Sequence, residues 1–238
     1  MKPEEVSTNK YLRNHYGENV VFEPDGNIPP DFLVNSVYAV EVRRLNQQFF
    51  EDDQALGLEQ LSFPLANAVK EVLSSYDSQY SGKSYWVNIY YKRPLDRNIR
   101  QVKSEMQIAL NDFLQSDLAL PCTIRVNEKI DLYIDSSDLV SEQVFRIAIE
   151  GDDDAGGGVI SVYSQNIRHC IFDKSSKINR YKSRYSSWWL YLVDYMELGL
   201  SNEDVTNVMS TISYLGEFDK VVIINHAGEF LLFEVSAK

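Results

Sequence analysis

The chain has 238 residues and is acidic, with 35 Asp and Glu against 23 Lys and Arg and a formal net charge of −12. This length can form one large domain or two small ones, and 44% apolar with 24% charged residues is ordinary for a globular protein. The net charge opposes nonspecific binding to nucleic acid or anionic membranes. No run approaches the roughly 18 apolar residues of a membrane helix.

The expected location is the cytoplasm, with no membrane partner. The first ten residues, MKPEEVSTNK, lack the apolar stretch of a secretory signal. The two cysteines, Cys122 and Cys170, form no disulfide framework and no metal-ligand spacing, which favours thiols in a reducing compartment.

The chain begins with a predicted helix over residues 3–16. Pro3 suits a first helical turn, Glu4 and Glu5 favour the positive end of the helix dipole, and Gly17 is placed to end the helix.

Three strands are predicted next, over residues 19–26, 32–35 and 37–45. A tight turn at Asn35 and Ser36 joins the last two, so the three strands form an antiparallel start to a sheet.

The following segments alternate between helix and strand patterns. Apolar residues at helical spacing predict a helix over 53–76, which Pro64 should kink or split. Residues 84–91 alternate and are rich in aromatics, as in a strand, and residues 97–115 form the next predicted helix with Asp96 as its cap.

The middle of the chain, about 118–166, is predicted to be rich in strands. Residues 123–135 form one strand or a short hairpin, and strands over 143–151 and 158–165 flank the loop Asp152–Gly158. That loop lacks the alternating ligands of a calcium site and the downstream helix of a phosphate loop, so it is interpreted as a mobile acidic connection.

The C-terminal part is predicted to hold the longest helix, over residues 173–197, with a basic first half and an apolar second half. A helix over 202–215 and two strands, 220–225 and 229–235, follow it. No polar linker divides the chain, so the predicted fold is a single elaborated α/β domain over 1–238.

The candidate metal-binding residues lie in the predicted hairpin of residues 29–45, PPDFLVNSVYAVEVRRL. Asp31 opens its first strand, and Glu41 lies in the second, where alternation places it on one face with Ala39 and Arg43. Carboxylate oxygens suit Mg²⁺ or Mn²⁺, and the backbone carbonyl of Val42 could add an oxygen. The alternative is a surface hairpin whose Glu41 pairs with Arg43 or Arg44.

The hairpin resembles the PD-(D/E)XK nuclease superfamily. The resemblance rests on Pro30 and Asp31, followed after nine intervening residues by Glu41, Val42 and Arg43. It also rests on the order of predicted elements over about residues 3–92, which matches an α-β-β-β-α-β core with a mixed sheet flanked by helices. The remainder would be a β-rich insertion and C-terminal helices.

The resemblance implies a restriction-endonuclease-like fold and a metal-dependent nuclease, with Asp31 and Glu41 as metal ligands. It also implies that a lysine orients or deprotonates the attacking water, yet Arg43 stands in its place. Arginine stays protonated and cannot act as a base, although it can stabilise charge on a phosphate. Family members often supply the lysine from a helix, and Lys70, Lys177 and Lys182 are candidates.

The first helix can supply the additional acidic ligand that some members of this family have. Glu5 is the candidate, and Glu4 is nearly as suitable.

Two basic segments, 92–103 and 168–184, are candidates for tracking a nucleic-acid backbone. The alternative is two solvated helix faces. The residues proposed to contact nucleic acid are Lys177, Arg180, Lys182 and Arg184. Trp188 and Trp189 are assigned to the core rather than to base stacking.

The sequence therefore predicts a metal-dependent nuclease that hydrolyses DNA or RNA with Mg²⁺ or Mn²⁺. An alternative is a catalytically inactive protein of the same fold that acts as a binding or regulatory subunit with a protein partner. An unrelated α+β interaction protein is the third interpretation.

Overall fold

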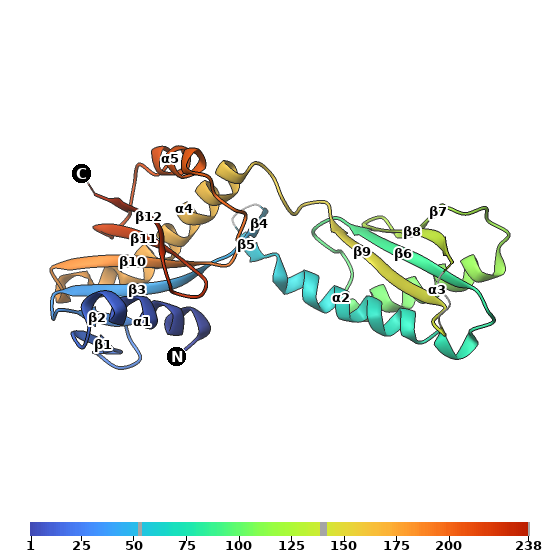
Figure 1. Ribbon diagram of the computed structural model, residues 1–238, viewed down its shortest axis with the longest axis horizontal. Coiled ribbons are helices and arrows are strands. Elements are labelled where there is room, and N and C mark those ends of the chain that lie inside the picture. The colour runs from blue at the N-terminus through green and yellow to red at the C-terminus, as the bar shows by residue number, and fades with distance from the viewer. Residues whose placement is uncertain (52–53, 139–141, 238) are drawn as a thin grey trace. The chain divides into compact units, whose positions relative to one another are not determined.

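A computed structural model describes residues 1–51, 54–138 and 142–237 (Figure 1), without the side chains at positions 51 and 54. The chain forms two compact units with mixed α/β structure. Unit 1 combines Met1–Gln47 with Gly156–Lys238, and unit 2 is Gln48–Ala155. Where a single elaborated domain was expected, the middle of the chain thus builds a sheet and a core of its own.

Unit 1 is built on a mixed six-stranded sheet of order β1-β2-β3-β10-β11-β12. Its strands are β1 (Val20–Phe22), β2 (Phe32–Val34), β3 (Tyr38–Leu45), β10 (Ser187–Asp194), β11 (Lys220–Asn225) and β12 (Leu231–Ser236). The three central strands, β3, β10 and β11, run parallel, whereas the pairs at both edges are antiparallel.

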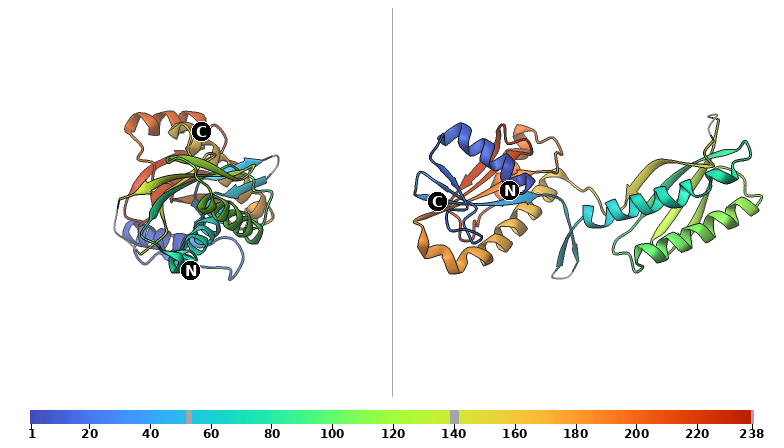
Figure 2. Two further views of the ribbon diagram at one scale, coloured as in Figure 1. Left: turned by 90° about the vertical axis from the view of Figure 1, so that its right-hand side faces the viewer. Right: turned by 90° about the horizontal axis from the view of Figure 1, so that it is seen from below.

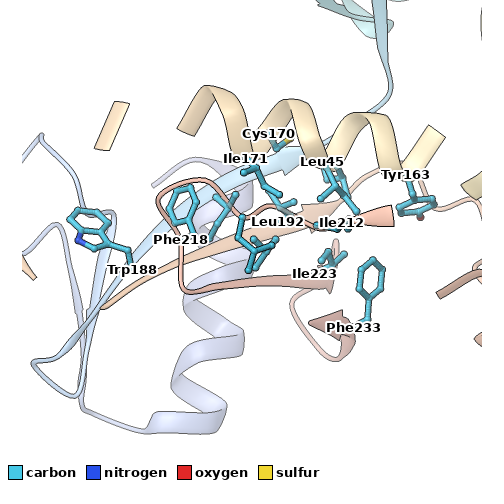
Figure 3. Packing of buried hydrophobic residues seen from close by; sticks show 14 of the residues in the cluster. Leu45, Tyr163, Cys170, Ile171, Trp188, Leu192, Ile212, Phe218, Ile223 and Phe233 are labelled. Carbon is cyan, nitrogen blue, oxygen red and sulfur yellow. The ribbon is translucent and has the colours of Figure 1, made fainter. Parts of the chain in front are cut away.

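Helices cover both faces of this sheet (Figure 2). The helices of unit 1 are α1 (Pro3–Tyr16), α4 (Val159–Ile178), the 3₁₀ segment η2 (Asn179–Arg184) and α5 (Asn202–Thr211). One apolar core lies beneath α1, and the second packs α4 and α5 against the opposite face of the sheet (Figure 3).

The alternation of β3 decides which of its side chains face which helix. Val40 and Val42 belong to the core beneath α1, whereas Ala39 and Leu45 belong to the core beneath α4. Glu41 and Arg43 share the α4 side because strand residues two apart point the same way. This register turns two charged side chains toward a helix that is distant in sequence.

Unit 2 has a four-stranded sheet of order β7-β8-β6-β9 and a separate two-stranded hairpin. Its elements are β4 (Gln48–Glu51), β5 (Gln54–Gly57), α2 (Glu59–Ser74), the 3₁₀ turn η1 (Asp77–Gln79), β6 (Ser84–Tyr91), α3 (Ile99–Gln115), β7 (Cys122–Asn127), β8 (Ile130–Ser137) and β9 (Phe145–Asp152). Both α2 and α3 pack on one face of the four-stranded sheet, around a third apolar core. Among the described helices of the chain, none is long and apolar enough to cross a lipid bilayer.

Most of the elements predicted before residue 152 are present. The helix over 3–16 and the antiparallel β1-β2-β3 ladder are confirmed, and both Asn35 and Ser36 have positive φ, which suits a tight hairpin turn. The hairpin alternative for 123–135 is confirmed as β7 and β8. The third helix is capped by the side chain of Asn98, so the expected cap at Asp96 is wrong.

Two predicted elements are wrong. Residues 158–165, expected as a strand, begin α4, and the expected helix over 173–197 divides into the end of α4, η2 and the strand β10. The segment SWWLYLVD is almost wholly buried because β10 is covered on both faces. A continuous apolar run of this kind does not distinguish a buried parallel strand from a buried helix.

The second predicted helix is shorter than expected. α2 begins at Glu59 after the β4–β5 hairpin and continues through Pro64 as one helix, whereas the expected first residue, Asp53, lies outside the described residues. The helix and strand that were expected to complete the nuclease-like core, α2 and β6, belong to unit 2. The acidic loop after β9 leads into α4, and Asp152 and Asp154 both accept hydrogen bonds from Arg93.

Replacing residues 48–155 with a short Gly-Ser linker should leave unit 1 folded. Gln47 Nε2 donates to the carbonyl of Gly156 at 3.0 Å, so the two ends to be joined already meet. Both cores of unit 1, as far as the structure describes them, consist of residues outside that segment. Circular dichroism and urea denaturation should show cooperative unfolding. Loss of a cooperative transition would contradict the assignment of two independent units.

Candidate functional site

Asp31 and Glu41 lie side by side at the end of the β2–β3 ladder. Phe32 pairs with Val40 in this antiparallel ladder, so the next position outward sets Asp31 opposite Glu41. The backbone N–H of Val42 donates to Asp31 Oδ2 at 2.7 Å, which fixes that carboxylate against β3. The spacing of ten residues between the acids thus follows from the hairpin register.

Lys174 joins the two acids from the facing helix α4. Its Nζ lies 2.6 Å from Glu41 Oε2 and 3.7 Å from Asp31 Oδ2. The side chains of Glu41, Lys174 and Asp31 are 3%, 14% and 24% exposed, respectively. This largely buried ion triad connects the β2–β3 hairpin with α4. Glu41 therefore pairs with Lys174 and not with a neighbouring arginine.

Glu41 is held in an unfavourable environment for a carboxylate. Burial raises the pKa of its carboxyl, the neighbouring Asp31 raises it further, and the Lys174 ammonium opposes both effects. Within the described ranges, Glu41 Oε1 is buried and has no hydrogen-bond partner. Such an oxygen is costly to bury without a ligand.

Arg43 supports the site rather than joining the two acids. Its guanidinium forms an ion pair with Asp173, and its Nη2 donates to His169 Nε2 at 3.1 Å. Burial, with Arg43 and Lys177 nearby, lowers the pKa of His169, which favours the neutral ring that accepts this bond. Because Asp173 precedes Lys174, Arg43 anchors the turn of α4 that carries the lysine.

The triad opens into a pocket of about 260 Å³. The loop from Glu23 to Pro30 forms one wall, and Asp31, Glu41, Lys174, Lys177 and Lys2 line the remainder. Two exposed lysines therefore stand beside a buried lysine and two carboxylates. Burial and the charges of Lys174 and Arg43 lower the pKa of Lys177.

The other predicted ligands are Glu5 and the backbone carbonyl of Val42. The carboxylate of Glu5 accepts from the backbone of Lys2 at 2.7 Å and pairs with the Lys2 side chain at 3.1 Å, so it serves as part of the α1 cap. Val42 lies beside the acids, and its contact with Asp31 is made by the backbone N–H, whereas the expected ligand was its carbonyl. No group of three or more His, Cys, Asp or Glu that could hold a metal occurs among the residues the structure describes.

The predicted nucleic-acid contacts are mostly engaged within the protein. Lys177 pairs with Asp173 at 2.8 Å and lines the pocket, Lys182 donates to the Glu217 carbonyl, and Arg184 pairs with Asp25 at 2.9 Å. Arg180 lies over the Tyr181 ring. Of the four, Lys177 is therefore the one that reaches the pocket of the two acids.

Trp188 and Trp189 are buried in unit 1, as their assignment to the core predicted. Three lysines were candidates to replace the motif lysine. Lys70 lies on α2 in unit 2, and Lys177 and Lys182 follow Lys174 in sequence. The lysine that contacts the two acids is Lys174 instead.

Sequence reasoning missed Lys174, the lysine that the structure brings to the acids. The expected helix began at residue 173, which hid the fact that Lys174 lies on a helix starting at Val159. The sequence did contain a signal for this helix. Cys170 and Ile171 are apolar and lie four and three residues before Lys174, and helical residues at this spacing share a face. A helix that covers all three residues would therefore turn Lys174 toward the sheet. Cys170 and Ile171 are indeed buried against the sheet (Figure 3).

A comparison of the chain with protein-family models, with curated proteins and with solved structures finds no significant match. The chemistry of the site therefore carries the functional argument.

The donor set fits a small, hard divalent cation. Mg²⁺ is commonly bound by one or two carboxylates while phosphate and water oxygens complete its shell. Asp31 and Glu41 provide the two carboxylates, and Glu41 Oε1 is a buried oxygen that lacks a partner in the described structure. These two residues would hold the ion.

Substituting Lys174→Met should destabilise the protein by about 3 kcal/mol, because removing one partner of a buried ion pair leaves the other charge uncompensated. Urea denaturation in EDTA provides the measurement. The control is Lys177→Met on the same helix, whose ion pair with Asp173 is more exposed and should contribute less than about 1 kcal/mol.

Adding Glu41→Gln to Lys174→Met should recover part of the lost stability, because the buried charge is then removed as well. Equal free energies of unfolding for Lys174→Met and Lys177→Met would contradict the importance of this ion pair.

Proposed function

We propose that the protein is a metal-dependent nuclease that hydrolyses phosphodiester bonds of DNA or RNA. Asp31 and Glu41 would bind Mg²⁺ or Mn²⁺, and Lys174 would take the role that the resemblance assigns to the motif lysine. The observation that carries the proposal is the convergence of Lys174 Nζ on both carboxylates, at 2.6 and 3.7 Å.

The order of elements in unit 1 supports the proposal. α1, β1, β2, β3, α4 and β10 follow one another when residues 48–155 are treated as an insertion between β3 and α4. β10 pairs in parallel with β3. This is the α-β-β-β-α-β order that the resemblance implies, with α4 and β10 in place of the helix and strand first expected.

The Lys174 ammonium is suited to contact both a nucleophilic water and a phosphate group. Its ammonium carries three donors on a flexible stem, so it can orient a water molecule and stabilise negative charge that develops on phosphate oxygens. Arg43 acts as a positioning residue, because its bond to Asp173 fixes the helical turn that carries Lys174.

The bound ion would supply Lewis acidity and lower the pKa of a coordinated water. The chain's own residues supply the remaining functions. Asp31 is held in place by the Val42 N–H, Glu41 is shielded from water, and the exposed Lys2 and Lys177 attract a phosphate to the pocket.

One observation favours a second candidate, a catalytically inactive protein of the same fold that binds a partner. The Lys174 ammonium already compensates the charge of Glu41, so this buried carboxylate needs no ion to balance its charge. In this candidate, the triad would contribute to stability and the pocket lysines would bind an anion without cleaving it.

Cleavage assays with single-stranded DNA, double-stranded DNA and RNA, in Mg²⁺ and then Mn²⁺, test the proposal. Asp31→Asn and Glu41→Gln should each lower the cleavage rate about a hundredfold or more, because each removes a charged ligand of the ion. Both substitutions preserve side-chain volume, so loss of activity would not reflect a cavity.

The control is Glu18→Gln, an exposed carboxylate of the same unit whose side chain is 99% exposed. It should cleave as the wild type does. Cleavage that persists in both Asp31→Asn and Glu41→Gln would refute the assigned site, whereas a wild type that cleaves none of the substrates would favour the inactive candidate.

A further inference from the structure

The side chain of Lys174 occupies the place that a metal ion would need. Its ammonium contacts Glu41 Oε2 and lies 3.7 Å from Asp31 Oδ2, and these are the two carboxylates assigned to the ion. A divalent cation on the same oxygens would lie within a few ångströms of this ammonium. Two like charges at such a distance in a water-poor site repel each other strongly.

The environment explains why a cation stays at this position. Asp31 and Glu41 lie opposite each other on neighbouring strands, so their like charges repel. Glu41 is almost wholly buried, so its charge requires a nearby partner. Lys174 meets that requirement from α4, so the buried charge of Glu41 is compensated before any ion arrives.

The cations around Glu41 differ in their freedom to move. Arg43 is held by both Asp173 and His169. By contrast, within the described part of the chain, the Lys174 ammonium has polar contacts with the two carboxylates alone. Its four-carbon stem reaches into the pocket of about 260 Å³ that the carboxylates also line. Lys174 can therefore leave the acids without breaking another interaction.

We propose that Lys174 is a displaceable internal counter-ion, so that a divalent cation binds Asp31 and Glu41 only by moving the ammonium off Glu41. Without the ion, the ammonium blocks both carboxylates and weakens metal binding. Once displaced, it lies in the pocket beside Lys2 and Lys177. This inference rests on the proposed function for the identity of the ion.

Isothermal titration of the full-length protein with Mn²⁺, without nucleic acid, tests the inference. Lys174→Met removes the competing charge while keeping an unbranched apolar stem, and it should bind Mn²⁺ at least about tenfold more tightly than the wild type. The control is Lys10→Met on α1, which removes a charge that pairs with Glu229 outside the pocket, and it should change the affinity by less than about threefold.

Two further variants keep the experiment decisive. Lys174→Gln retains a hydrogen-bond donor without the charge and should reproduce the gain if Lys174→Met fails to fold. Glu41→Gln combined with Lys174→Met should lose the gain, because a carboxylate ligand is missing. Added Mn²⁺ should also raise the melting temperature of Lys174→Met by more than that of the wild type.

Equal or weaker Mn²⁺ binding by both Lys174 variants would overturn the inference even if the wild type cleaves nucleic acid. Tighter binding in the absence of any cleavage would support the counter-ion and refute the proposed nuclease. If no variant binds Mn²⁺, both conclusions fail.

Discussion

The parallel pairing of β3 with β10 is the constraint on which the rest of unit 1 depends. Parallel neighbours cannot be joined by a tight turn, so the chain must cross over one face of the sheet between them. α4 is the helix of that crossover, and it lies on the face toward which β3 turns Glu41 and Arg43. The helix thus brings Lys174 to Glu41 and Asp173 to Arg43. Strand alternation and one crossover together assemble the site.

The hairpin half of this arrangement could be predicted from the sequence. The turn at Asn35 and Ser36 and the alternation of β3 are local properties, and they place Asp31 opposite Glu41 without further information. The other half depends on residues far along the chain. Lys174 becomes a neighbour of the acids through tertiary packing, which no local spacing encodes.

The incorrect predictions have separate physical causes. VISVYSQ is rich in β-branched residues yet begins a helix, because its apolar positions continue at helical spacing through Cys170 and Ile171 into the core. SWWLYLVD is buried on both faces and has no alternation to reveal a strand. Unit 2 was not predicted because no polar linker separates it from unit 1 in the sequence. Its boundary follows from which residues contact one another in the fold and not from the amino-acid composition.

The insertion point at Gln47 and Gly156 has a consequence for the kinetics of folding. Tyr38 pairs with Ser187, so the central ladder of unit 1 must close a very long loop, and such non-local pairing slows folding. Residues 48–155 leave the ribosome before β10 and have a core of their own. Once they fold, their two ends lie together, and the loop that separates β3 from β10 becomes effectively short. Early folding of the inserted segment would therefore accelerate the step that brings Lys174 to Glu41.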